Sequence, residues 1–88
     1  MLVEKVFKLE SGDGLHARPA GLFVKALSPY KSAVEVELKG QKKNGKSIMS
    51  LMSLGAAPGD ELKISINGDD ADRAMSALEQ LFASKFVL

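Results

Sequence analysis

The sequence predicts an α+β fold in which helices cover one face of a mostly antiparallel sheet. Residues 33–39 and 61–66 alternate apolar and polar side chains, which is the period of a strand with one buried face. Residues 17–27 place apolar side chains three and four positions apart, as an amphipathic helix does. A chain of 88 residues is long enough for one domain, residues 1–88, and too short for two.

Four strands are expected. The first, at 2–9, is less regular than the alternating strands at 33–39 and 61–66, and a weak polar strand follows Gly40 at 41–44. The inward faces of the two alternating strands would carry Val34, Val36, Leu38, Leu62, Ile64 and Ile66.

Three helices complete the order β-α-β-β-α-β-α. The first spans 17–27, and the second, at 48–54, lies between Ser47, a good N-cap residue, and a glycine that suits a helix end. The third begins near Asp69 or Asp70, so that acidic residues occupy its first turn. Its buried stripe would be Ala74, Leu78, Leu81 and Phe82.

Composition excludes several classes of protein. Twelve basic and eleven acidic residues give a net charge of +1, without the basic excess expected of a nucleic-acid-binding protein. The absence of cysteine excludes disulfides, thiolate nucleophiles and zinc–cysteine clusters, and favours a reducing, cytoplasmic setting. The N-terminal MLVEKVFKLE mixes charged and apolar residues, which is typical of neither a signal peptide nor a membrane span.

Four lysines, Lys39, Lys42, Lys43 and Lys46, lie within eight residues without an intervening acid. Lysines on an edge strand commonly prevent edge-to-edge pairing, and this is the favoured interpretation. The alternative is a docking patch for an acidic partner.

The only histidine lies in the stretch GLHARPA, residues 14–20. Glycines before it permit a tight turn, and Pro19 is tolerated only in the first turn of a helix, so His16 is expected at or near the N-cap. Its ring would lie beside the unpaired amides of Ala17 and Arg18, where the helix dipole favours an anion.

This arrangement suits phosphoryl transfer. A neutral imidazole would attack a phosphoryl donor and hold the group as phosphohistidine while the amides and the Arg18 guanidinium steady its oxygens. The group then passes to an acceptor, and no general base is required within the chain. The alternative is that His16 is an ordinary surface or capping residue beside an arginine.

A second motif is KSIMSLMSLG, residues 46–55. Its short helix has more apolar side chains than one buried stripe can hold, and Leu51 and Leu54 are the better core candidates. An apolar patch for partners would then consist of Ile48, Met49 and Met52. Alternatively, an attached subunit or loop covers these side chains.

Ser47 is first of all an N-cap, and most such serines have no further role. A phosphate on it would meet the same helix-terminal amides and would add about −1.5 to −2 charge beside the patch. Modification of Ser47 would therefore change which partners can dock.

The two motifs, in this order and about thirty residues apart, resemble those of the HPr family, the phosphocarriers of the bacterial phosphoenolpyruvate-dependent sugar phosphotransferase system. The resemblance spans essentially the whole chain. It implies an open-faced β-sandwich with four antiparallel strands covered by three helices. It also implies a phosphoryl carrier that is not itself an enzyme, has no cofactor or metal, inserts into no membrane, binds no nucleic acid and is monomeric.

The resemblance further implies roles for individual residues. His16 matches the histidine phosphorylated at Nδ1 by phospho-enzyme I and discharged onto the A domains of the sugar-specific enzymes II, and Arg18 matches the phosphate-steadying arginine. Ser47 matches the serine phosphorylated by an ATP-dependent HPr kinase, which lowers transfer through the histidine and promotes binding to a carbon-catabolite repressor. The family's apolar docking surface and its basic rim fall on Ala20, Phe23, Ile48, Met49 and Met52, and on Lys25 and Lys46.

Two stretches depart from the family pattern. QKKNG, residues 41–45, has Lys43 and Gly45 where relatives commonly have apolar residues, so a frayed third strand is expected. The ending ASKFVL is more apolar than many family tails, so that Phe86 to Leu88 either pack back on the domain or join a partner.

Three other functions compete. A regulator that works mainly through phospho-Ser47 is disfavoured by His16, because dedicated regulators of this kind lack the histidine. A carrier of the nitrogen-related branch would use the same chemistry without sugar delivery, but the context of Ser47 and the Met-rich helix favour the sugar branch. A small RNA-binding domain would need exposed aromatic pairs on its strands, which this sequence lacks.

Overall fold

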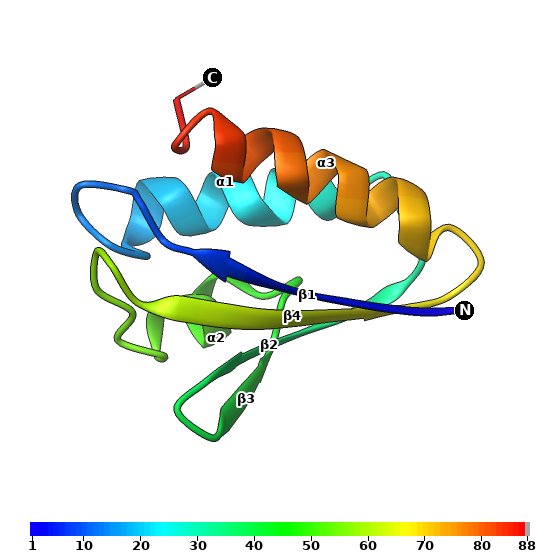
Figure 1. Cartoon of the computed structure of the whole chain (residues 1–88), viewed down its shortest axis with the longest axis horizontal. Coiled ribbons are helices and arrows are strands. Elements are labelled where there is room, and N and C mark those ends of the chain that lie inside the picture. The colour runs from blue at the N-terminus through cyan, green and yellow to red at the C-terminus, as the bar shows by residue number, and fades with distance from the viewer. Residues whose placement is uncertain (88) are drawn as a thin grey trace.

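The computed structural model, which describes residues 1–87, contains a four-stranded antiparallel sheet with helices on one face (Figure 1). The strands are β1 (Leu2–Lys8), β2 (Ala33–Leu38), β3 (Gln41–Asn44) and β4 (Glu61–Asn67), and their order in the sheet is β1-β4-β2-β3. The helices are α1 (Ala17–Leu27), α2 (Ile48–Met52) and α3 (Ala71–Ala83). This confirms the predicted order of elements and the open-faced β-sandwich.

The two central strands bury one face each, as their alternating sequences predict. The inward side chains of β2 and β4 are at most 7% exposed, whereas their neighbours face solvent on the side without helices. They are Val34, Val36, Leu38, Leu62, Ile64 and Ile66. Strand β1 is less regular because it lies at the sheet edge, where Leu2 and Val6 remain about 60% exposed.

Helices α1 and α3 lie side by side over the inner face (Figure 1), while α2 packs against the side of α1 and against β3. Within residues 1–87 the longest helix has thirteen residues, and none is long and apolar enough to cross a bilayer. The predicted stripe of α3 is buried as expected: Ala74, Leu78, Leu81 and Phe82.

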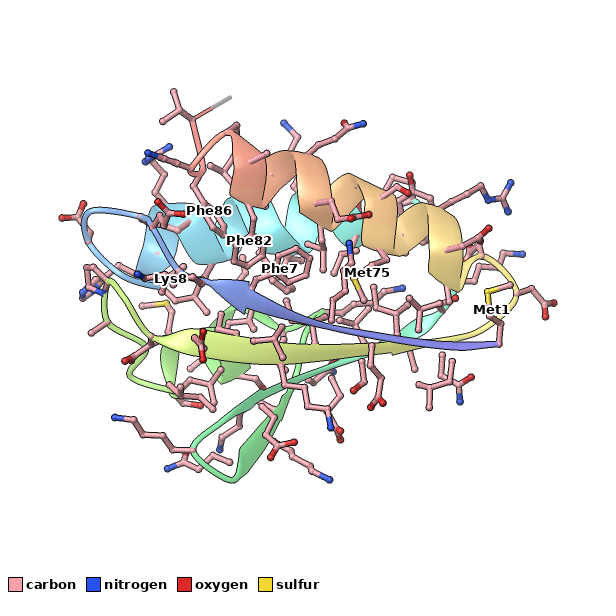
Figure 2. All side chains as sticks on the ribbon, viewed as in Figure 1. Met1, Phe7, Lys8, Met75, Phe82 and Phe86 are labelled. Atoms are coloured by element: carbon pink, nitrogen blue, oxygen red, sulfur yellow. The ribbon has the colours of Figure 1, made fainter. Side chains whose placement is uncertain are left out.

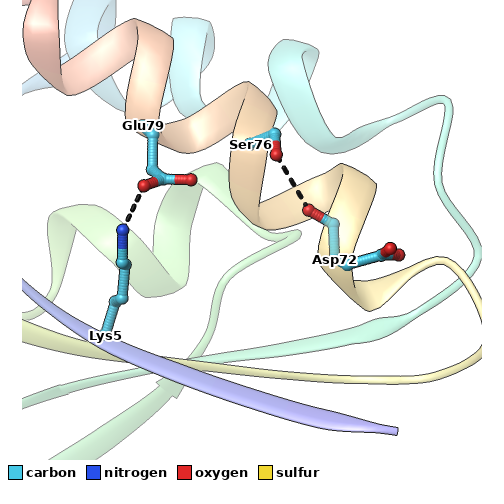
Figure 3. A network of polar contacts seen from close by, with 4 residues as sticks. All are labelled: Lys5, Asp72, Ser76 and Glu79. Atoms are coloured by element: carbon cyan, nitrogen blue, oxygen red, sulfur yellow. Dashed lines mark hydrogen bonds and ion pairs between the residues drawn. The ribbon is translucent and has the colours of Figure 1, made fainter.

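An aromatic cluster joins the helices to β1 beneath them (Figure 2). Phe82 of α3 stacks on Phe7 of β1 with ring centroids 4.4 Å apart and meets Phe23 and Phe86 edge-on at 6.3 and 5.0 Å. Such pairs contribute about 0.5–1.5 kcal/mol beyond the burial of area. The exposed ion pair between Lys5 of β1 and Glu79 of α3 (Figure 3) contributes less, about 0–1 kcal/mol.

Strand β3 is better formed than the lysine-rich sequence indicated. All four of its residues pair with β2, and the amide of Gly45 extends this pairing with a 2.8 Å hydrogen bond to the carbonyl of Val34. A β-carbon at Gly45 would overlap the side chain of Val34, so glycine permits the close approach. The expectation of a frayed strand was therefore wrong, whereas the predicted edge position of its lysines is confirmed.

Asp70, at the start of α3, ties this helix to the segment before β2. Its carboxylate accepts hydrogen bonds from the backbone amides of Lys31 at 2.9 Å and Ser32 at 3.1 Å, and from the Ser32 hydroxyl. The bond from the Ser32 hydroxyl, and then that from the Lys31 amide, lower the pKa of Asp70 from 3.8 to about 2. The ionised form is therefore favoured by folding.

We predict that Asp70→Asn destabilises the protein near neutral pH and weakens the acid sensitivity of its stability. Because the pKa of Asp70 is depressed by folding, its contribution is present above about pH 4 and is lost as pH falls toward 2. Urea denaturation between pH 7 and pH 2 should show the two proteins converging in free energy of unfolding. Asp69→Asn, at the exposed neighbouring residue, is the control. If wild type and Asp70→Asn differ in free energy of unfolding by the same amount at every pH down to 2, the prediction is wrong.

Candidate functional site

His16 is the N-cap of α1, as the sequence predicts. Its backbone is extended, with φ −80° and ψ −170°, and its carbonyl accepts the first helical hydrogen bond from the amide of Ala20 at 2.9 Å. The imidazole is exposed and makes no capping hydrogen bond. The side chain is thus free to meet another molecule at the positive end of the helix.

The backbone amides beside His16 are also free. Those of Ala17 and Arg18 donate no hydrogen bond to any atom of residues 1–87, and Pro19 has no amide hydrogen. An anion attached to the exposed imidazole would therefore find two unpaired donors and the helix dipole nearby. This matches the electrostatic environment expected from the sequence.

The loop before α1 is fixed by contacts with the loop before β4. Gly14 has φ +69°, and a β-carbon there would overlap the carbonyl oxygen of Ala56. The amide of Leu15 donates to that same carbonyl at 3.1 Å, and the Leu15 side chain is only 3% exposed. His16 is thus held in position by its buried neighbour while its own side chain stays in solvent.

A hollow of about 390 Å³ opens beside the imidazole. It joins the histidine loop to the end of α2, since Met52 lies on its wall with His16, and Asp13 is the carboxylate at its margin. The 56–58 loop, which sequence reasoning did not assign to the site, supplies much of the rest. The full lining is Asp13, Leu15, His16, Met52, Gly55, Ala56, Ala57 and Pro58.

Arg18 has a contact that sequence reasoning missed. Its Nη1 donates to the carbonyl oxygen of Phe86 at 3.3 Å, and within residues 1–87 no hydrogen bond joins the guanidinium to His16. The side chain is otherwise exposed, so it can leave this acceptor by rotation. The arginine therefore links the start of α1 to the C-terminal turn.

That turn packs back on the domain. Of the two expectations for the tail, packing on the domain is therefore confirmed for Phe86, and binding to a partner is not needed to bury its side chain. Lys85 and Phe86 both have positive φ, 57° and 62°, yet the Phe86 side chain is fully buried. Two such residues cost about 1 kcal/mol or more each, similar to the 1.5–3 kcal/mol gained by burying a phenylalanine. The edge-on contact with Phe82 and the bond from Arg18 then favour the turn. Val87 is 70% exposed, and Leu88 lies outside the described residues.

Helix α2 divides its apolar side chains as predicted. Leu51 and Leu54 are buried at 0% and 8%, while the outward patch, which we call the α2 patch, is Ile48 at 42%, Met49 at 82% and Met52 at 42% exposure. The helix itself ends at Met52 rather than at 54. The amide of Ser53 still bonds four residues back to Met49, but those of Leu54 and Gly55 bond three residues back in a tighter final turn.

Ser47 is the N-cap of α2 and accepts a 3.2 Å hydrogen bond from the amide of Ser50 through its hydroxyl oxygen. It is partly exposed and directly precedes the α2 patch. Because Ser47 is partly exposed at the N-cap and adjoins the α2 patch, a charge added to its hydroxyl would change the electrostatics of that surface.

Three of the expected docking residues behave differently from the prediction. Ala20 and Phe23 are fully buried, because they lie on the stripe of α1 that faces α3 and the sheet, so neither can offer docking surface. Lys46 is half-buried and its ammonium donates to the carbonyl of Tyr30, so it is not a free rim charge. Lys25, in the last turn of α1, is exposed as expected.

The chain matches known proteins along nearly its whole length. Residues 3–84 match the family model for the PTS HPr component phosphorylation site. The chain is 39% identical over 85 residues to the phosphocarrier protein HPr of Treponema pallidum, covering 97% of both chains.

Solved structures agree. The chain superposes on HPr-C-His from Thermoanaerobacter tengcongensis with a TM-score of 0.91 and 45% identity, covering 96% of this chain and 94% of that one. A structure described as an HPr dimer from the same organism is 49% identical, with a TM-score of 0.78 and coverage of 85% and 86%. Both relatives share the sheet and the covering helices.

Proposed function

Because the chain belongs to the HPr family of phosphocarrier proteins of the phosphotransferase system, we propose that His16 is the residue that receives and passes on the phosphoryl group. The observation that carries the assignment is an exposed imidazole at the start of α1 which, like the amides of Ala17 and Arg18 beside it, has no hydrogen-bond partner among residues 1–87. Phosphorylation needs such access, since the same group must meet a donor and then an acceptor.

In the proposed transfer, a lone pair on Nδ1 of His16 attacks the phosphorus carried by phospho-enzyme I. The bond between phosphorus and the enzyme I atom breaks, and its electron pair stays with enzyme I. Discharge onto the A domain of an enzyme II follows the same course, with the bond to Nδ1 breaking. The amides of Ala17 and Arg18 donate to the phosphoryl oxygens while the group is held.

Arg18 would exchange one acceptor for another during this cycle. In the resting protein the guanidinium bonds to a neutral carbonyl, that of Phe86, whereas a phosphoryl group on His16 carries negative charge. A bond from the guanidinium to a charged phosphoryl oxygen adds Coulomb attraction that the bond to a neutral carbonyl lacks, so the phosphoryl oxygens are the preferred acceptor when present. Arg18 then steadies the phosphate that His16 holds.

The α2 patch, together with exposed Lys25 of the contacting helix α1, is the proposed docking surface for enzyme I and the enzyme II A domains. Ala17, also exposed, continues this surface beside His16. A phosphate on Ser47, added by a serine kinase, would place negative charge at its margin, and carbon-catabolite control would act through that change. The carrier is expected to act as a cytoplasmic monomer, although two related structures are described as dimers.

We predict that His16→Ala abolishes phosphorylation by enzyme I and phosphoenolpyruvate but leaves the protein folded. The imidazole is exposed and makes no capping bond, so the free energy of unfolding should change by about 0.5 kcal/mol at most. Phosphate on the wild-type protein should be acid-labile and base-stable and should map to His16. Label retained at another residue of the variant would refute the assignment.

For Arg18→Ala, we predict that phosphotransfer slows by about tenfold or more, because a positioned charge is lost from the phosphoryl oxygens. Loss of the bond to Phe86 should cost only about 1 kcal/mol of stability. The chain's other arginine provides the matched control, Arg73→Ala. Rapid-quench transfer rates equal for the two variants would rule out phosphate steadying.

Ser47→Asp should weaken transfer from enzyme I, and the effect should shrink as salt is raised because it is electrostatic. Ser47→Asn is the matched control, since asparagine is a good N-cap of the same shape without the charge. We expect the Asp variant to show a higher KM for enzyme I than the Asn variant at low ionic strength. If the two variants have the same KM, charge at Ser47 does not govern docking.

A further inference from the structure

A second hollow, of about 710 Å³, lies where β3 stops and β2 continues back toward Lys31. We call it the lysine hollow. It shares no residue with the hollow at His16, and its wall includes Leu2, which lies at the opposite end of β1 from the histidine loop (Figure 1). It is lined by Leu2, Lys31, Ser32, Ala33, Val34, Glu35, Lys42, Lys43, Asn44, Lys46, Ser65 and Asn67.

The charge of this hollow is unbalanced. Four lysines line it, Lys31, Lys42, Lys43 and Lys46, against one carboxylate, Glu35. Among residues 1–87 none of the four has a carboxylate oxygen within 4.0 Å, although Lys63 in the same sheet lies 3.8 Å from Glu4. Glu37 faces Lys42 across the strand pair without forming such a contact. The charges of Lys31, Lys42 and Lys43 are therefore available to a ligand, whereas the Lys46 ammonium already donates to the carbonyl of Tyr30.

Part of this charge is fixed in position. The ammonium of Lys46 donates to the carbonyl of Tyr30, and its backbone amide donates to Asn44 Oδ1 at 2.9 Å. A lysine held in this way loses less side-chain entropy on binding than a freely rotating one. If these lysines served only to prevent edge-to-edge pairing, Lys46 would not need hydrogen bonds that hold it in one position.

The form of the hollow indicates the form of its ligand. All four strands contribute to its wall, and Ala33, Glu35 and Ser65 face the side of the sheet without helices. A ligand that reaches from Leu2 of β1 to Lys42 of β3 must therefore be elongated. A second copy of this chain would bring the same lysines to this surface and be repelled. Leu2, 60% exposed, and Ala33 supply apolar surface, but among residues 1–87 no aromatic side chain lines the hollow for a nucleic-acid base to stack on.

We propose that the lysine hollow binds an extended acidic segment of a partner protein, laid across the helix-free face of the sheet. Its carboxylates would meet Lys31, Lys42 and Lys43, and its apolar side chains would lie against Leu2 and Ala33. Since this surface lies apart from His16, the site is independent of phosphotransfer, and a partner could remain bound while His16 is used.

The test is titration of the full-length protein with a fluorescein-labelled octapeptide of alternating Glu and Val, followed by fluorescence anisotropy and by amide chemical shifts. We expect saturable binding that weakens with salt, with the largest shifts at residues 31–35 and 42–46. An octapeptide of alternating Gln and Val should bind much more weakly. Absence of saturable binding, or shifts centred on residues 16–18, would overturn the proposal.

Charge reversal supplies the matched variants. Lys42→Glu should weaken binding by about fivefold or more, since it replaces an attractive contact with a repulsive one. Lys8→Glu is the control, because Lys8 is also an exposed strand residue facing a glutamate, Glu61, across the sheet but lies outside the hollow. Equal weakening by both variants would show that only net charge matters. Tighter binding of a labelled single-stranded octanucleotide than of the acidic peptide would also reject the proposal.

Discussion

The contact between the histidine loop and the 56–60 loop is the constraint on which the site depends. Leu15 and Gly14 meet the backbone of Ala56, and the same two loops are joined further back by paired hydrogen bonds of 2.8 Å between Leu9 and residues Gly59 and Asp60. Because these bonds fix the backbone up to residue 15, α1 must begin immediately afterwards. The cap position is thereby assigned to His16, and its side chain is directed to solvent.

This arrangement separates stability from chemistry along consecutive residues. Leu15 is buried and anchors the loop, His16 is exposed, and Pro19 and Ala20 return to the interior within one helical turn. A reactive side chain that contributes little to the core can be modified without unfolding its surroundings. The free amides at the start of α1 are an unavoidable feature of a helix end, and here they lie where negative charge would be placed.

Most of the fold and the central part of the site follow from local patterns in the sequence. Strict alternation in β2 and β4, helical spacing in α1 and α3, and a proline just inside a helix start are signals carried by neighbouring residues. The features that were predicted wrongly depend instead on contacts between residues far apart in the sequence. Gly45 was taken as a weakness of β3, but it fits against Val34, which is eleven positions away.

The same distinction explains the site residues. Ala20 and Phe23 were assigned to the docking surface by resemblance, although their spacing on α1 also marks them as the buried stripe, and the helix can present them to only one side. The bond from Arg18 to Phe86 joins residues 68 positions apart and depends on a C-terminal turn with two left-handed residues, which side-chain pattern does not encode. The hollow at His16 likewise needs the 56–58 loop, which only the sheet topology brings near.

The small size of the α2 patch is consistent with its proposed role as a docking surface that releases each partner. Three exposed side chains on a five-residue helix offer far less apolar area than the interfaces of lasting complexes, which bury about 800 Å² per partner. Two of the three are methionines, whose flexible thioether chains adapt to surfaces of different shape. In the proposed docking role, a weak, adaptable contact would shorten the lifetime of each complex and permit one surface to serve a donor and then an acceptor. The inward residues of the same segment, Leu51 and the nearby Leu54, meanwhile hold the helix on the core.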